Sequence, residues 1–266
     1  EGLVVGGAVE IFGKSSKYFG YYRSHALYLS LIGDAKAFFG EMYGKKMGEN
    51  FGVTGSMHIL SPKKNLMSVS AIVSSTIGPA IGHAYGASLD KSNKITVSFF
   101  GDGATEQGVF HEALNFASLK SLPIAFICLN NNLAIDIEIK DRQSYSISKI
   151  VKSYGIKYFK ISSSKIEDVC KVYYEAKKYL ISNKKPVFID AIYYRYLQHI
   201  GLQNDFQETK NKFEKSNYRS FHEYKLKLKQ DPFILICNEI KKKYSEKFLN
   251  NFLKKKEEEL EIIIKE

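Results

Sequence analysis

The sequence predicts an α/β protein in which a parallel sheet is covered by helices on both faces. Short apolar stretches rich in β-branched and aromatic residues alternate with stretches of helical periodicity. The apolar stretches are nearly uninterrupted, which is typical of parallel strands that are buried on both faces. One strand, a helix and the next strand also fit into about 35 residues, the length of a βαβ crossover.

The clearest elements lie in the middle of the chain. Residues 95–100 predict a strand that runs directly into Gly101-Asp102-Gly103, and residues 107–120 predict a helix. Residues 122–129 predict a second, fully buried strand that ends in Asn130-Asn131-Asn132. Further along, residues 166–182 have helical spacing and lead into a strand at residues 186–194.

A stretch of small residues, 72–89, precedes this unit. Gly78, Gly82 and Gly86 are four positions apart and therefore share one face of a helix. Because each glycine costs a helix about 1 kcal/mol relative to alanine, three in register indicate close packing against another helix, in this chain or in a partner. The alternative is a broken helix with a loop at Gly78 and Pro79.

The chain ends in polar and helical segments. Residues 199–219 are polar without a strong period and predict a long loop, and residues 231–266 predict two helices. Leu253, Leu260 and Ile264 are expected on the buried side of the last helix. We therefore expect one α/β domain at residues 1–200, with the loop and C-terminal helices of residues 201–266 packed on it.

Composition excludes several classes of protein. With 44% hydrophobic and 25% charged residues, the chain is neither disordered nor collagen-like. No apolar run reaches the roughly 18–20 residues of a membrane-spanning helix. The net charge of +11 is spread along the chain, so we expect a solvated basic surface; nucleic acid or another acidic partner is the alternative. Three widely separated cysteines indicate a reducing cytoplasm.

The residues at the two strand ends point to a metal and a phosphate. Asp102 and Asn131 follow neighbouring parallel strands and should meet at the edge where ligands bind in such sheets. Glycines there let a phosphate approach the backbone amides, and the carboxylate would repel a diphosphate unless a cation stood between them. Asp102, Asn131 and the carbonyl of Leu133 offer hard oxygens, which Mg²⁺ prefers. The alternative is that Gly101-Asp102-Gly103 is a plain turn.

These residues carry a family resemblance. The segment from Gly101-Asp102-Gly103 to Asn130-Asn131 resembles the thiamine diphosphate motif. With Tyr22-Arg23-Ser24-His25, Gly55-Ser56-Met57-His58 and Tyr194-Arg195-Tyr196, the whole chain resembles the alpha subunit of the thiamine-dependent decarboxylating component of 2-oxo acid dehydrogenase complexes. The resemblance implies a thiamine diphosphate-binding, transketolase-like fold with a C-terminal helical extension. It also implies that a leading helix is absent and that Glu1 is not the natural start.

The resemblance assigns roles to individual positions. It implies that Asp102, Asn131 and the Leu133 carbonyl bind Mg²⁺. It implies that the cofactor-binding residues are these three together with Tyr22, Arg23, Ala71, Val73, Gly103, Ala104 and His199. His199 and His58 are the candidate catalytic side chains. The alternatives are a surface ion pair for Arg23, an ordinary loop position for His199, and a role in shaping the pocket for His58.

Some positions depart from the family pattern. Leu129 and Leu133 replace the family's Glu and Tyr, and Gly52-Val53-Thr54-Gly55 replaces its Gly-Lys-Gly-Gly. Ile200 stands where mitochondrial pyruvate members have a phosphorylated serine, so we do not expect that regulation. These changes leave the cofactor prediction intact and leave the substrate open.

The resemblance implies a subunit that decarboxylates a small 2-oxo acid and passes the acyl group to lipoamide. A beta-type subunit supplies the activating Glu, giving a heterotetramer, and a lipoyl acyltransferase is a further partner; nucleic acid and membranes are not expected as partners. An acetoin-type dehydrogenase, an acyloin-forming synthase and a non-catalytic assembly subunit remain as alternatives.

Overall fold

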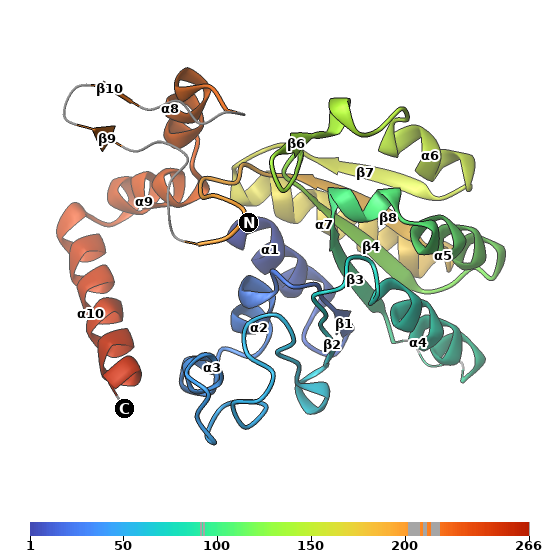
Figure 1. The fold of residues 1–266 in the computed structure, drawn as a ribbon, viewed down its shortest axis with the longest axis horizontal. Helices are drawn as coiled ribbons and strands as arrows, with labels where there is room; N and C mark the ends of the chain where they lie inside the picture. The colour runs from blue at the N-terminus through green and yellow to red at the C-terminus, as the bar shows by residue number, and fades with distance from the viewer. Residues whose placement is uncertain (91, 93, 202–207, 210–211, 214–218, 266) are drawn as a thin grey trace.

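The computed structural model describes residues 1–90, 92, 94–201, 208–209, 212–213 and 219–265. At its centre is a six-stranded sheet in the order β2-β1-β3-β4-β8-β7, and all neighbouring pairs are parallel (Figure 1). The predicted parallel α/β architecture is confirmed. The strands of this sheet are β1 Lys17–Phe19, β2 Leu66–Ser68, β3 Thr96–Gly101, β4 Ile124–Asn130, β7 Lys157–Ile161 and β8 Val187–Ile192.

Helices cover both faces of the sheet. One face carries α1 (Gly2–Phe12), α2 (His25–Leu31), α3 (Ala35–Met42) and α7 (Ile166–Asn183), and the other carries α4 (Ile77–Leu89), α5 (Gly108–Leu119) and α6 (Ile147–Ser153). Side chains alternate between the two faces along each strand. Phe99 and Ile127 therefore enter the first core, whereas Phe100 and Phe126 enter the second.

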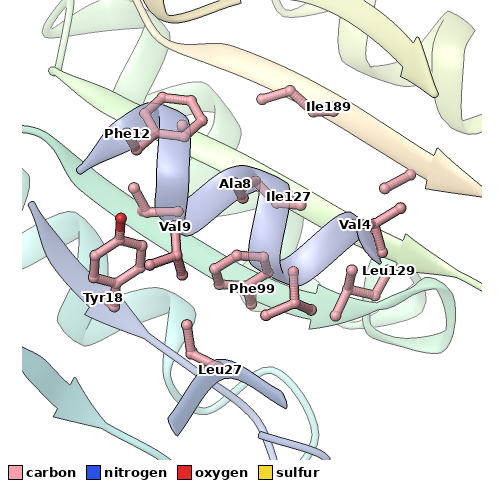
Figure 2. Packing of buried hydrophobic residues seen from close by; sticks show 14 of the residues in the cluster. Val4, Ala8, Val9, Phe12, Tyr18, Leu27, Phe99, Ile127, Leu129 and Ile189 are labelled. Carbon is pink, nitrogen blue, oxygen red and sulfur yellow. The ribbon is translucent and has the colours of Figure 1, made fainter. Parts of the chain in front are cut away.

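The first core shows how sequence spacing sets the packing. Apolar residues of α1 recur at helical intervals and form one stripe. Figure 2 shows Val4, Ala8 and Phe12 of this stripe lying over the sheet residues Ile127, Leu129 and Ile189. Strand β4 is buried along its whole length, as its uninterrupted apolar sequence predicts.

The remaining elements connect or flank this body. Three short 3₁₀ helices are η1 (Pro62–Lys64), η2 (Asp102–Glu106) and η3 (Ile139–Asp141). Two antiparallel pairs are β5 (Leu133–Ala134) with β6 (Ile137–Glu138), and β9 (Glu208–Thr209) with β10 (Lys212–Phe213). No helix in the described parts of the chain is long and apolar enough to cross a membrane.

Helix α4 carries the three spaced glycines. It runs unbroken from Ile77 to Leu89, so the broken-helix alternative is wrong; Pro79 lies in the first turn, where proline is tolerated. Apart from adjoining residues and the backbone of α4 itself, no described atom lies within 4 Å of a β-carbon placed at Gly78, Gly82 or Gly86. The glycine face is therefore open within the described part of the chain.

The C-terminal helices differ from expectation in burial. The two predicted helices are α9 (Pro232–Lys243) and α10 (Glu246–Lys265), and α8 (Phe221–Lys229) precedes them without having been predicted. Leu249 is buried, whereas Leu260 and Ile264 are each 43% exposed, so the expectation for these two residues is wrong. The reason is that α10 lies at the margin of the molecule, beside α9 and α3 and apart from the central sheet, so its apolar side is only partly covered (Figure 1). Most of the predicted loop at 199–219 lies outside the described residues.

Candidate functional site

The two central strands bring Asp102 and Asn131 together. Gly101 at the end of β3 is paired with Leu129 near the end of β4, so the residues that follow both strands emerge at the same edge of the sheet. This edge is termed the carboxyl edge. The backbone N–H of Asn131 donates to Oδ1 of Asp102 at 3.3 Å. The predicted proximity of these two residues is therefore present.

Asp102 is a buried carboxylate with a cationic partner. Its residue is 1% exposed, and burial raises its pKa to about 6, although the neighbouring Arg142 opposes the rise. Arg142 contacts Oδ2 of Asp102 with Nη2 and Oε1 of Glu106 with Nη1. A buried carboxylate needs such a partner, because an unpaired charge in the interior is costly.

The loop after β4 is held in an unusual conformation. Asn131 accepts from the Leu133 N–H through Oδ1 (2.9 Å) and donates through Nδ2 to the Tyr193 hydroxyl (3.1 Å). Ile135 adopts a φ of 55°, a left-handed value that is strained for a β-branched residue. Arg195 stabilises this turn by donating to the Ile135 carbonyl at 2.8 Å. Such strain is typical of functional loops.

A cationic group lies on the same edge. Arg23, which follows β1, donates to the His199 carbonyl at 3.2 Å, and its guanidinium lies 3.5 Å from Nδ1 of His199. The ring of Tyr22 is 6.0 Å from the ring of His199, and Arg195 is 3.4 Å from the same Nδ1. Burial and the two guanidinium groups lower the pKa of His199. The structure therefore gathers Tyr22, Arg23 and His199, as the resemblance implies.

The segment after β2 also reaches the carboxyl edge. Ser74 is buried and donates to the Ala104 carbonyl at 3.1 Å, which brings the segment containing Ala71 and Val73 against η2. Gly103 lies close to the loop after β4, because a β-carbon there would be 3.3 Å from Cβ of Ala134. The predicted cofactor positions thus come from the ends of several parallel strands.

A further segment, residues 50–58, is organised by Glu41. This carboxylate is 1% exposed and accepts hydrogen bonds from the backbone of residues 50, 52, 54 and 55 and from the Thr54 hydroxyl, at 2.7–3.0 Å. Beyond it, the Ser56 hydroxyl lies 2.7 Å from Nε2 of His25. His58 is half-buried in this segment, and its catalytic role stays a prediction.

A cavity of about 740 Å³ lies beside the loop after β4. It is lined by Asn131 and Leu133 of that loop, by residues of α1, α8 and α9, among them Phe233, and by Arg219, which precedes α8. Because Asn131 and Tyr193 both line it, the cavity opens at the carboxyl edge of the sheet.

The side-chain oxygens at the carboxyl edge are suitable ligands for a divalent cation. Asp102 and Asn131 are oxygen donors of the kind Mg²⁺ prefers, but among the described residues no three His, Cys, Asp or Glu side chains form a metal cluster. Backbone and ligand oxygens would have to complete the coordination, which is usual for Mg²⁺ bound with a phosphate.

Sequence reasoning missed Arg142, Glu106 and Glu41, and it gave no role to Arg195 although that residue stands in one of the motifs that carry the resemblance. Arg142 is forty positions from Asp102 and lies in a polar segment without a motif, so no local signal connects the two. Glu41 sits in a short helix where a glutamate is ordinary. Tertiary contacts show which groups these residues bind.

The fold and the site define a parallel α/β protein with a carboxylate, an amide and arginines gathered at one sheet edge. The chain belongs to the dehydrogenase E1 component family, whose family model matches residues 1–261. The predicted family is thereby confirmed.

The individual relatives share about a third or less of their aligned residues with this chain. The chain is 33% identical over 164 residues to 2-oxoisovalerate dehydrogenase subunit alpha 2 of Arabidopsis thaliana, covering 61% of this chain and 34% of that protein. It is 28% identical over 203 residues to the pyruvate dehydrogenase E1 component subunit alpha of Rhizobium meliloti, covering 76% and 58%. The corresponding mouse 2-oxoisovalerate dehydrogenase subunit alpha is 27% identical over 232 residues, covering 87% and 50%. The chain thus spans less than two thirds of each of these relatives.

A structural comparison finds a putative thiamin diphosphate-dependent enzyme from Mycobacterium smegmatis. The TM-score is 0.49 at 16% sequence identity, covering 72% of this chain and 31% of that one.

Proposed function

We propose that the carboxyl edge binds thiamine diphosphate with Mg²⁺. One observation carries this proposal: Asp102 and Asn131 follow adjacent parallel strands in a chain of the dehydrogenase E1 component family. Asp102, Asn131 and the Leu133 carbonyl would hold the metal. Tyr22, Arg23 and His199, with the backbone of Gly103 and Ala104, would hold the diphosphate, because a guanidinium and free amides suit phosphate oxygens. The backbone of Ala71 and Val73 would seat the aminopyrimidine ring.

When bound, the cofactor supplies an electron sink for decarboxylation of a small 2-oxo acid, and the protein supplies binding, orientation and electrostatics. Arg23 and Arg195 keep positive charge at the edge, while burial holds His199 toward its neutral form. His199 and His58 are proposed to meet the substrate. Lipoamide is the proposed acceptor of the acyl group.

We further propose that this chain is the alpha-type subunit of a heterotetramer with a beta-type partner that supplies the activating Glu. Support comes from the relatives' names, which describe alpha subunits, and from strongly exposed apolar side chains in loops. Phe51, Val53 and Ile72 are 72%, 83% and 72% exposed. Apolar side chains this exposed are typical of interfaces. A lipoyl acyltransferase is the second proposed partner.

The proposed compartment is the cytoplasm. The cysteines Cys128, Cys170 and Cys237 are free, which supports a reducing environment. The charge of +11 is assigned to solvated surface, so nucleic acid is not among the proposed partners.

The cofactor proposal is tested by replacing the charged metal ligand. Asp102→Asn should weaken the affinity for thiamine diphosphate at fixed moderate Mg²⁺ by more than about 100-fold, because a lost outer-shell partner alone costs 10–100-fold. Calorimetry on the assembled protein measures this. Asp168→Asn removes an exposed carboxylate at the start of α7 and should leave the affinity unchanged. Unchanged affinity in the Asp102 variant would contradict the assignment.

A further inference from the structure

Arg142 is bound to the same carboxylate that the proposed metal requires. It lies directly after η3, and its side chain is only 9% exposed. The guanidinium contacts Oδ2 of Asp102 and Oε1 of Glu106, and Nε donates to the Ile137 carbonyl at 3.3 Å. Arg142 is therefore held at three points rather than lying loosely on the surface.

The two oxygens of Asp102 are not equivalent. Oδ1 accepts from the Asn131 backbone and is committed to the loop after β4. Oδ2 is the oxygen that remains for an external cation, and it is the oxygen that Arg142 contacts. Mg²⁺ binds oxygen at about 2.0–2.1 Å with near-octahedral neighbours, which leaves no room for a guanidinium nitrogen at the same carboxylate position.

We propose that Arg142 is the internal counter-cation of Asp102 and that a divalent metal binds only by displacing Arg142 from Oδ2. This inference rests on the proposed metal-binding function of the carboxyl edge. Glu106 gives the displaced guanidinium a second partner, so the side chain can pivot without leaving the site. Gln143 fixes Glu106 in place by donating to its Oε1 at 2.8 Å.

The arrangement couples the metal to its anionic ligand. A metal that arrives alone must break the Asp102–Arg142 ion pair, and the guanidinium then lies close to a divalent charge. A diphosphate arriving with the metal supplies negative charge that offsets this repulsion. Arg142 thereby lowers the affinity for free metal more than the affinity for the metal with its diphosphate.

The test is Mn²⁺ binding measured by electron paramagnetic resonance on the full chain without thiamine diphosphate. Arg142→Gln should bind Mn²⁺ at least about tenfold more tightly than the unaltered chain, because the competing cation is gone. Lys140→Gln is the matched control, since Lys140 lies in the same segment but is exposed and paired with Glu138. It should bind Mn²⁺ as the unaltered chain does.

Equal or weaker Mn²⁺ binding by Arg142→Gln would overturn the proposal. Because Asp102 would be left buried without its cationic partner, that variant should also unfold at a lower temperature, and Mn²⁺ should raise its melting temperature more than that of the unaltered chain. This second measurement decides the matter if the variant is poorly folded, and absence of the larger Mn²⁺ effect counts against the proposal. Failure of the chain to bind thiamine diphosphate, with tighter Mn²⁺ binding by the variant, would refute the cofactor and leave the counter-cation role standing.

Discussion

Arg23 and His199 meet at the carboxyl edge although 176 positions separate them in the sequence. Arg23 is held against the His199 main chain, and its guanidinium also lies 5.4 Å from the centre of the Tyr22 ring. A guanidinium fixed in this way loses little further entropy when it binds an anion. This geometry favours a phosphate-binding role for Arg23, which stays a prediction.

Arg23→Ala should weaken binding of thiamine diphosphate by about 10- to 100-fold, because a hydrogen bond to a charged group contributes about 1.5–3 kcal/mol. The turnover number at saturating cofactor should change less. Titration calorimetry and steady-state kinetics measure the two effects.

Lys177→Ala is the matched control for Arg23→Ala, since Lys177 donates to the Ile11 carbonyl at the end of α1. The control should bind cofactor normally. If cofactor affinity held in Arg23→Ala and only the Michaelis constant of the substrate rose, Arg23 would contact the substrate instead.

At the scale of an element, the segment of residues 50–58 depends on one buried carboxylate. Burial alone would raise the pKa of Glu41, but hydrogen bonds from Gly52, Asn50 and Thr54 outweigh this and lower it. A group whose pKa is lower in the folded state contributes stability above its unfolded pKa, and this contribution is lost as the pH falls through its folded pKa. The segment should therefore loosen in acid.

Glu41→Gln should lower the free energy of unfolding by about 2–4 kcal/mol at pH 7. The reason is that the amide nitrogen, itself a donor, would face backbone N–H groups that donate hydrogen bonds to the carboxylate in the unaltered chain. The difference in the free energy of unfolding between this variant and the unaltered chain should shrink when the pH falls below about 4.5, the pKa of an unfolded glutamate. Denaturant titrations at pH 7 and near pH 3.5 measure this.

Glu10→Gln is the control for Glu41→Gln, because Glu10 is exposed on α1. It should lower stability little at either pH. A stability loss in Glu41→Gln that stays constant with pH would show that the carboxylate charge is not what holds the segment.

The open glycine face of α4 makes a second prediction at this scale. Gly82→Leu should leave stability unchanged or raise it by about 1 kcal/mol, because glycine disfavours the helix and the built β-carbon meets open space. Association with the beta-type partner should weaken if this face is the contact surface. Thermal melts measure stability, and analytical ultracentrifugation measures association with the beta-type partner. If association were unchanged in Gly82→Leu, the contact surface would not be the glycine face.

At the scale of the whole molecule, one parallel sheet with its helices accounts for the described core. The proposed diphosphate half of the site lies at the carboxyl edge of that sheet. A thiamine enzyme also needs a carboxylate against the pyrimidine ring, and we assign that carboxylate to the beta-type partner. An obligate interface of this kind would bury a large area.

We therefore expect the purified chain to lack decarboxylase activity until a beta-type partner is added. Turnover of a 2-oxo acid with saturating thiamine diphosphate and Mg²⁺, measured with and without the partner, checks this. Substantial turnover by the isolated chain would refute the two-chain arrangement.

The sequence alone predicted strands β3, β4 and β8, helices α4, α5 and α7, and the meeting of Asp102 with Asn131. These follow from local periodicity and from the rule that parallel strands end at one edge. The sequence predicted strand β4 in particular, because a strand that is buried on both faces has an apolar run in place of alternating polar and apolar residues.

Only the tertiary structure decided which distant side chains accompany these residues. Arg142 reaches Asp102, Glu41 holds the segment of residues 50–58, and α10 lies apart from the central sheet, so that Leu260 stays exposed. Periodicity shows that a helix has an apolar side but not whether another element covers it. Likewise, an arginine in a polar segment carries no mark of its partner, because ion pairs across a fold depend on chain geometry rather than on local sequence.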